Sequence, residues 1–282
     1  MDRESTFEMY LRDKRRLAKT TKDSYAQSIQ GLLDFCPQEL QEITYIDIVT
    51  WLKYLRETKS CGPATIRLRF SAVKSFFTYL VEEGIICINP TIGVKGPKLQ
   101  KTKPPLLPTN TIFQLREATN DSLRLRTLIE VLYCTGVRVT ELINIKIQDI
   151  KWDDNAILIT RAKRKIQRFV FFTYECGYLL ELLINSRKNQ DDCPYLFINH
   201  HRQQLTRQGV FYLLKNVLDT ETNLDTNIYP HLFRHNLASM LIEMDARLQA
   251  VADILGHKNY NSTRIYARFS NKARKKNYDK YF

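Results

Sequence analysis

T-G-V-R-V-T-E-L occupies residues 135–142, and the second half of the chain can be interpreted around this stretch. Gly136 permits a tight turn, and the residues after it suit the start of a helix. Arg138 is therefore expected near the amide-rich end of that helix, where a guanidinium can bind two phosphate oxygens. Glu141 follows one helical turn later, where its carboxylate can hold the guanidinium in place.

Two later motifs add side chains of related chemistry. H-L-F-R-H spans residues 231–235, and the three-residue spacing puts His231 and Arg234 on one face of a helix. L-G-H ends at His257 after a predicted glycine turn, and Tyr266 follows nine residues later. With Arg138, these residues provide the two guanidiniums, two imidazoles and phenol that metal-free attack on a phosphodiester requires.

The spacing of His231 and His235 raises the question of a zinc site. Zinc helices of the H-E-x-x-H type carry glutamate at the second position, where this chain has Leu232. No cysteine or carboxylate cluster completes such a site, so we predict no metal and no cofactor. His235 is then interpreted as a packing residue.

Composition limits the class of protein. The chain has 282 residues, 44% of them hydrophobic, and a formal net charge of +13, which indicates a globular protein with a polyanionic partner. The alternative is a basic surface that serves solubility alone. Six scattered cysteines without a C-x-x-C pair fit reduced, cytoplasmic thiols. We find neither a signal peptide nor an apolar run long enough for a membrane.

A basic, proline-rich run divides the chain. K-G-P-K-L-Q-K-T-K-P-P-L-L-P covers residues 95–108 with four prolines and four lysines, and we expect an extended connector there. We therefore predict a first domain over residues 1–96, a linker over 97–108 and a second domain over 109–282. The lysines of the linker would suit a phosphate backbone, and we take Lys98 and Lys101 as candidate DNA contacts.

Helical spacing dominates the first part. Residues 44–47 resemble a capping box, and Gly62-Pro63 begins a longer helix that ends near Gly84. One face of this longer helix carries basic side chains that we take as candidate DNA contacts: Arg67, Arg69 and Lys74. We predict a small helical bundle that binds DNA.

The second part is predicted to be mainly helical with a small antiparallel sheet. Helices are expected over 109–115, 123–133 and 140–147, and again from about Gly177. Residues 156–160 and 167–172 are rich in β-formers around a basic tip, which predicts a hairpin.

The motifs at 135–142, 231–235 and 255–257, with the tyrosine nine residues later, resemble the tyrosine recombinase (phage-integrase-like) family. The separation of 23 positions from Arg234 to His257 matches the family pattern. The resemblance covers nearly the whole chain. It implies a mainly α fold with a SAM-like core-binding domain and a catalytic domain. The compact build resembles Xer-like or transposon cointegrate-resolving members.

The resemblance also assigns roles residue by residue. Arg138 and Arg234 match the arginines that clamp the scissile phosphate, and His231 matches the histidine of the H-x-x-R pair. His257 fills a position that is His or Trp in relatives. Tyr266 matches the nucleophile, and Glu141 matches an acidic residue that supports the first arginine.

The family's catalytic lysine is harder to place. Relatives carry G-K-G-x-K-x-R at a hairpin tip, whereas this chain has R-A-K-R-K-I-Q-R at residues 161–168. Aligning Arg168 with the last arginine selects Lys163, and Lys165 is the competitor. The tip lacks the glycines of relatives.

The implied reaction is site-specific recombination of DNA. Tyr266 would attack the phosphodiester and form a 3′-phosphotyrosyl link, with His231 accepting the phenolic proton and Lys163 protonating the leaving oxygen. The link retains the phosphodiester energy, so no ATP is required. Double-stranded DNA with an inverted-repeat core site and a homotetramer are the implied partners, without a membrane. The need for an accessory protein is left open.

Three alternatives use the same observations. A monomeric type IB topoisomerase would relax supercoils by the same chemistry, and a non-catalytic DNA-binding regulator would keep only the fold. A nuclease is disfavoured because the sequence offers no carboxylate cluster for Mg²⁺. The sequence does not disclose the target site, integration versus resolution, or the host element.

Overall fold

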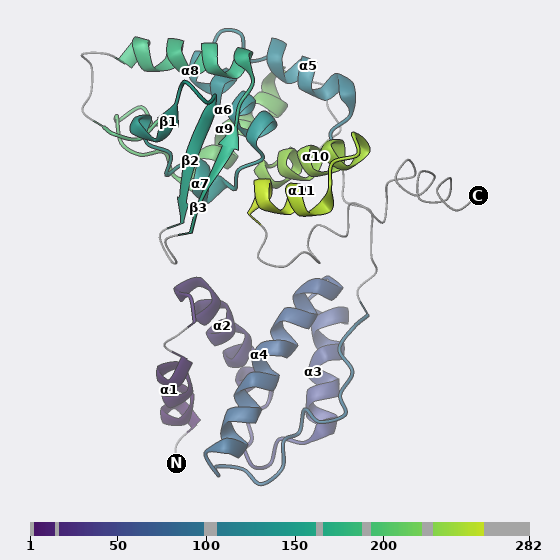
Figure 1. Cartoon of the computed structure of the whole chain (residues 1–282). Helices are drawn as coiled ribbons and strands as arrows, with labels where there is room; N and C mark the ends of the chain where they lie inside the picture. Colours follow the sequence, from purple (N-terminus) through teal and green to yellow (C-terminus); the bar gives the residue numbers. More distant parts are fainter. Residues whose placement is uncertain are drawn as a thin grey trace. The chain divides into compact units, whose positions relative to one another are not determined.

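The computed structural model describes residues 3–14, 17–98, 106–161, 166–187, 193–221 and 228–256 (Figure 1). The chain divides into two compact units, residues 1–101 and 102–282. The predicted boundaries at 96 and 108 stay a prediction, because much of the connector lies outside the described residues. None of the described helices is both long and apolar enough to cross a membrane.

The first unit is a helical bundle, as predicted. Its helices are α1 (Arg3–Asp13), α2 (Lys19–Phe35), α3 (Tyr45–Glu57) and α4 (Pro63–Glu82). The capping box that begins α3 is confirmed: the Asp47 carboxylate accepts from the Thr44 amide at 2.8 Å, and the Asp47 amide donates to the Thr44 hydroxyl. Helix α4 begins at Pro63, and Gly84 adopts a left-handed conformation after its end.

Buried aromatic side chains form the core of this bundle. Trp51 of α3, Phe76 and Phe77 of α4, and Tyr10 of α1 are almost completely buried. The Tyr10 ring meets the Phe76 ring edge-on, with 5.3 Å between the centroids. Helix α1 was not predicted from the sequence, because its residues are mostly polar and show no clear apolar face. It packs on the bundle through a few side chains, among them Tyr10.

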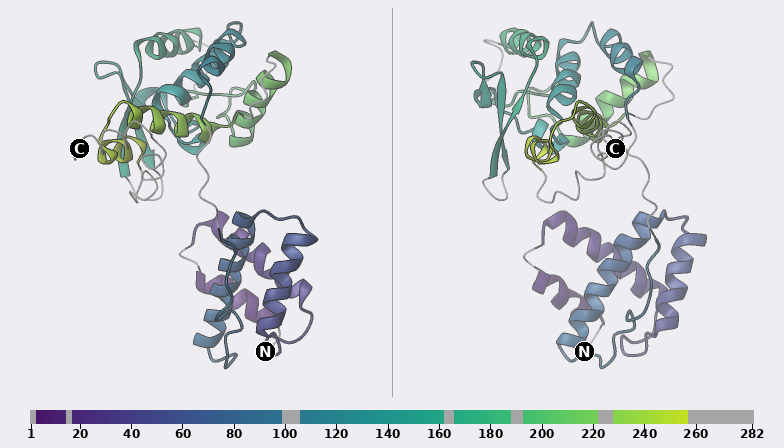
Figure 2. Two further views of the ribbon diagram at one scale, coloured as in Figure 1. Left: turned by 90° about the vertical axis from the view of Figure 1, so that its right-hand side faces the viewer. Right: turned by 45° about the vertical axis from the view of Figure 1, so that its right-hand side comes forward.

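The second unit is mainly helical with a small sheet at one side, which confirms the predicted fold class (Figures 1 and 2). Its helices are α5 (Thr109–Glu117), α6 (Leu123–Thr135), α7 (Val139–Leu142), α8 (Tyr174–Arg187), α9 (Arg207–Glu221), α10 (Pro230–Glu243) and α11 (Leu248–Leu255). Helix α6 packs on both α8 and α10, and α11 lies against α10 and strand β3. These contacts bring the segments 135–142, 231–235 and 255–256 together.

The hairpin prediction is confirmed. Strand β2 (Ala156–Arg161) pairs antiparallel with β3 (Ile166–Phe171), and the short β1 (Ile150–Lys151) pairs with the other edge of β2. The register places Arg168 opposite Ile159. A turn at residues 152–155 joins β1 to β2, with Asn155 in a left-handed conformation.

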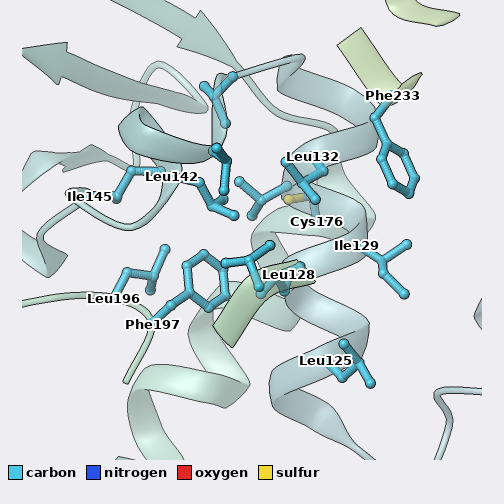
Figure 3. Close-up of a cluster of buried hydrophobic side chains, with 14 of the residues drawn as sticks. Leu125, Leu128, Ile129, Leu132, Leu142, Ile145, Cys176, Leu196, Phe197 and Phe233 are labelled. Carbon is cyan, nitrogen blue, oxygen red and sulfur yellow. The ribbon is translucent and has the colours of Figure 1, made fainter. Parts of the chain in front are cut away.

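The core of the second unit is built around α6, which packs against α7, the region of Ile145 and the segment 196–197. Figure 3 shows side chains of α6 gathered with others from α7, the 145 region and the 196–197 segment. Leu128, Leu132, Leu142 and Phe197 are fully buried there. This packing fixes the C-terminal end of α6, from which the turn at Gly136 leads to Arg138.

One predicted helix is much shorter than expected. The sequence indicated a helix over 140–147, but α7 ends at Leu142. The backbone then bonds to a distant segment: the Leu196 amide donates to the Ile145 carbonyl at 2.8 Å, and the Ile147 amide donates to the Pro194 carbonyl at 2.9 Å. These tertiary hydrogen bonds replace those of a longer helix.

Candidate functional site

The turn between α6 and α7 sets the position of Arg138. Gly136 ends α6 with φ +57°, and Arg138 is the residue that precedes α7. A Cβ atom on Gly136 would lie 2.8 Å from Leu237 Cδ2, so the turn requires glycine for both space and conformation. The predicted glycine turn is confirmed.

Arg138 is held by Glu141, which lies one turn further along. Its backbone amide donates to Glu141 Oε2 at 2.9 Å, and its Nη1 donates to Glu141 Oε1 at 3.0 Å. The Arg138 side chain is 26% exposed, whereas that of Glu141 is 6% exposed. The guanidinium thus has one side towards solvent and one side fixed by a buried carboxylate.

A second guanidinium binds the same carboxylate. Arg168 of β3 donates through Nη1 to Glu141 Oε1 at 3.0 Å and through Nη2 to Oε2 at 2.8 Å. Burial alone would raise the pKa of Glu141, but the hydrogen bonds and charges of Arg168 and Arg138 outweigh it and hold the pKa well below its usual range. Glu141 is therefore a permanent anion at neutral pH.

Arg234 completes the group from α10. It is 3% exposed, and its Nη1 donates to the Gly136 carbonyl at 2.9 Å. Its Nη2 donates to the Leu255 carbonyl, which also accepts from Arg138 Nη1 at 3.4 Å. The two guanidiniums therefore lie within two hydrogen-bond lengths of each other. We call Arg138, Arg168 and Arg234, together with Glu141, the arginine cluster.

The end of α11 supplies the remaining acceptors of the arginine cluster. The carbonyls of Ile254, Leu255 and Gly256 each accept from at least one of the three arginines. These carbonyls lie at the negative end of the helix dipole, which favours cations. Gly256 adopts φ +63° directly after α11, as the L-G-H motif predicted.

His231 lies on the same helix as Arg234, one turn away, and is exposed. More than a third of its surface is accessible, but loss of water around the rest of the imidazole lowers its pKa, and the charges of Arg234, Arg138 and Arg207 lower it further. The imidazole is consequently neutral at neutral pH and can accept a proton. The ring of His235 lies 6.4 Å from that of His231, between centroids.

Several predicted site residues lie outside the described residues. They are Lys163 with its competitor Lys165, His257, Tyr266 and Lys101. Their predicted roles stay predictions.

The candidate DNA contacts of the first unit are on α4 and after it. Arg67 and Lys74 are exposed on α4, Arg69 on the same helix is half-buried, and Lys98 is exposed further along. Their exposure is compatible with contact to DNA. Their role in binding stays a prediction.

Arg168 was not predicted as a member of the site. In the sequence it served only to align the hairpin tip, although it is an arginine in a strand of otherwise mostly apolar residues. Its contact with Glu141 spans 27 positions in the sequence. That contact could be found only from the tertiary packing of α11 on β3 and of α7 on β2.

Comparison with known proteins identifies the family. Residues 107–273 match the phage integrase family, and residues 5–86 match its N-terminal SAM-like domain. Tyrosine recombinase XerC of Listeria welshimeri is 32% identical over 99% of this chain and 96% of the relative. Tyrosine recombinase XerC of Roseiflexus is 30% identical over 94% of this chain and 88% of the relative.

Solved structures have the same fold. The Tn1549 transposon integrase in complex with a circular intermediate DNA matches with a TM-score of 0.81 at 17% identity, over 98% of each chain. XerH site-specific recombinase bound to its difH substrate matches with a TM-score of 0.78 at 20% identity, over 97% of this chain and 83% of that one. The chain belongs to the phage integrase family, the tyrosine recombinases that carry out site-specific recombination of DNA.

Proposed function

We propose that this chain cuts and rejoins DNA strands at a specific site through a 3′-phosphotyrosyl intermediate on Tyr266. The observation that carries the proposal is the arginine cluster, in which Arg138 and Arg234 share the Leu255 carbonyl. Three guanidiniums accompany one carboxylate, so the group has an excess of positive charge. Such an arrangement suits a phosphodiester, whose charge increases as the nucleophile attacks.

The arginines act on the transition state. Both are fixed by Glu141 or by backbone carbonyls before any substrate binds, so little reorganisation is needed during the reaction. Removing one such preorganised donor costs about 100- to 1,000-fold in rate in comparable sites. We therefore assign Arg138 and Arg234 to the non-bridging oxygens of the scissile phosphate.

Proton transfers complete the step. The Tyr266 oxygen forms a bond to phosphorus, the bond from phosphorus to the 5′ oxygen breaks, and His231 accepts the phenolic proton. The lowered pKa of His231 supports this role, because the base must be neutral before it acts. Lys163 donates a proton to the 5′ oxygen, and His257 binds the phosphate. The reverse sequence joins a new strand.

The assembly follows from the same proposal. The partner is double-stranded DNA with an inverted-repeat core site, and four copies of the chain form the synapse, in the cytoplasm. XerH and lambda integrase have been solved on DNA, the latter as a dimer and as a tetramer, which supports this proposal. We assign residues 1–96 to core binding, 97–108 to the connector and 109–282 to catalysis. An accessory protein is not required by the proposal.

The experiment is covalent capture. A duplex selected from a random pool by binding to the chain is nicked next to the scissile phosphate, so that cleavage releases a short fragment and cannot reverse. The wild type should give a protein–DNA adduct stable in SDS, and Tyr266→Phe should give none. Tyr260→Phe and Tyr278→Phe are matched controls that should retain the adduct. Mapping of the adduct to another side chain, or loss of the reaction with a chelator, would refute the proposal.

A paired-site assay separates recombination from topoisomerase activity. The wild type should exchange strands only between two copies of the selected site. Relaxation of supercoiled DNA without that site would favour the type IB topoisomerase alternative. An intact fold that binds the site but forms no adduct would favour a regulator.

A further inference from the structure

We infer that Arg168 is a positioning residue for strand cleavage, which links the β2–β3 hairpin to Arg138 and to the end of α11. The inference rests on the proposed function. It concerns a side chain that would not touch DNA itself: the Arg168 side chain is only 11% exposed.

The contacts of Arg168 reach three elements. From β3, both Nη atoms bind the two oxygens of Glu141 on α7, at 3.0 and 2.8 Å. The Nε atom donates to the Ile254 carbonyl on α11 at 2.9 Å. All three guanidinium nitrogens are thus used in holding α7 and α11 against the strand. A bidentate pair of this kind fixes orientation as well as distance.

Gly256 makes this arrangement sterically feasible. A Cβ atom at position 256 would lie 3.0–3.1 Å from Cδ, Cζ and Nε of Arg168. The guanidinium therefore lies directly against the backbone that leads from α11 to His257. Arg168 also lies near the start of β3, opposite Ile159 of β2. In the sequence Lys163 comes shortly before β3, so Arg168 joins the strand next to the candidate acid to the carboxylate that holds Arg138.

The charge balance requires Arg168 as well. Glu141 is buried, and burial of a carboxylate without sufficient compensation is costly. Arg138 supplies one cation, but it must also bind the phosphate. Arg168 supplies a second cation, so the carboxylate can keep holding Arg138 while Arg138 interacts with substrate.

A second ion pair in the same unit provides a matched control. Arg116 of α5 binds buried Glu130 of α6 in the same bidentate manner, at 2.7 and 2.9 Å. Glu130 also has a second cation nearby, as Glu141 does: Arg126 Nη2 lies 3.5 Å from Glu130 Oε1. Arg116→Met and Arg168→Met each remove one bidentate pair between an arginine and a buried glutamate, but only the second pair involves Arg138.

The first measurement is the single-turnover cleavage rate of the full chain on the nicked duplex. Arg168→Met should lower the rate about 100-fold, because a displacement of about 1 Å at the reacting groups has this effect. Arg116→Met should cleave at nearly the wild-type rate. Both variants should bind the intact duplex as tightly as the wild type. Thermal unfolding shows whether Arg168→Met and Arg116→Met lose the same amount of stability.

A double-mutant cycle tests the route through Glu141. If Arg168 acts by holding this carboxylate, Arg168→Met should cost much less in a Glu141→Gln background than in the wild type. Arg168→Lys keeps the charge but not the two-point geometry, so it should restore only part of the rate. Independent, multiplicative losses would overturn the inference.

The pH profile gives a readout that general instability would not change. Among the described residues, Arg168 of β3 and Arg138, just before α7, lower the pKa of Glu141, and His231 of α10 interacts electrostatically with it. In Arg168→Met one cation is lost while burial remains, so the pKa of Glu141 rises. The ionised form holds Arg138, so the rate of this variant should fall on acidification at a higher pH than in the wild type or in Arg116→Met.

The outcomes separate the inference from the proposed function. Absence of an adduct with the wild type refutes both. A normal adduct with the wild type, together with a normal rate and pH profile for Arg168→Met, refutes the inference alone. Weakened DNA binding by Arg168→Met would also overturn it, because the side chain would then contact substrate.

Discussion

Replacement of Gly136 by alanine should damage the second unit in two ways. The residue has φ +57°, a conformation that costs an L-residue about 1–2 kcal/mol. The new Cβ would also lie 2.8 Å from Leu237 Cδ2 and 3.3 Å from Leu255 Cδ2. Crowding of this kind in a packed site costs about 1–3 kcal/mol. We therefore expect the free energy of unfolding to fall by roughly 2–5 kcal/mol.

The same substitution should also affect cleavage. Leu237 lies on α10 with Arg234, Leu255 ends α11, and the Gly136 carbonyl accepts from Arg234. Relief of the clash would move the groups that hold the guanidiniums. Given the 100-fold effect of a displacement of about 1 Å, we expect a loss of rate of that order in molecules that remain folded.

Gly84→Ala is the matched control. Gly84 has φ +68° at the end of α4, but a Cβ there would meet nothing within 4 Å. It should therefore show the conformational cost of about 1–2 kcal/mol without the crowding. Native-state hydrogen exchange measures each unit separately. The reasoning is wrong if Gly136→Ala destabilises its unit no more than Gly84→Ala destabilises its own.

Three further predictions follow from single contacts. Because burial and nearby arginines lower the pKa of His231, wild-type cleavage should persist as the pH falls through about 6.5, the usual value of a histidine, and should fall only at the lowered pKa. Single-turnover rates across pH measure this, and a midpoint above about 6.5 would contradict it. Glu141→Gln should destabilise the second unit by about 3–5 kcal/mol at pH 7. The pKa of Glu141 is lower in the folded protein than in the unfolded chain, where it is about 4.3. The difference in stability between wild type and variant should therefore be present above about pH 4.3 and shrink as the solution is acidified further. A difference in denaturant titrations that stays constant with pH would contradict this. Thr44→Ala removes the cap of α3 and should lower the free energy of unfolding of the first unit, measured by hydrogen exchange, by about 1 kcal/mol. It should have no effect on the cleavage rate of protein saturated with DNA.

Local signals in the sequence predicted the parts of the structure that depend on near neighbours. The capping box at Thr44, the turn at Gly136 and the β2–β3 hairpin are each determined by residues a few positions apart, and all three are present. The helix predicted over 140–147 was wrong because its backbone groups bond to residues 194–196. Periodicity within one segment contains no information about such a distant partner.

The candidate site shows the same division. Motif spacing placed Arg138 next to Glu141, and His231 on a helix with Arg234. It could not show that Arg168 binds Glu141 as well, or that the carbonyl end of α11 accepts from all three arginines. These contacts join residues that are 21 to 118 positions apart. They follow from packing of the hydrophobic core rather than from any motif.

The arrangement explains how several cations remain together before any phosphate arrives. Mutual repulsion of three guanidiniums is offset by a buried carboxylate and by carbonyls at the negative end of α11. These acceptors fix the guanidiniums by hydrogen bonds but neutralise only part of their charge. A phosphodiester therefore meets donors already in position, and the remaining positive charge matches the negative charge that forms during attack. A site that used one carboxylate for each arginine would be more stable but less attractive to the transition state.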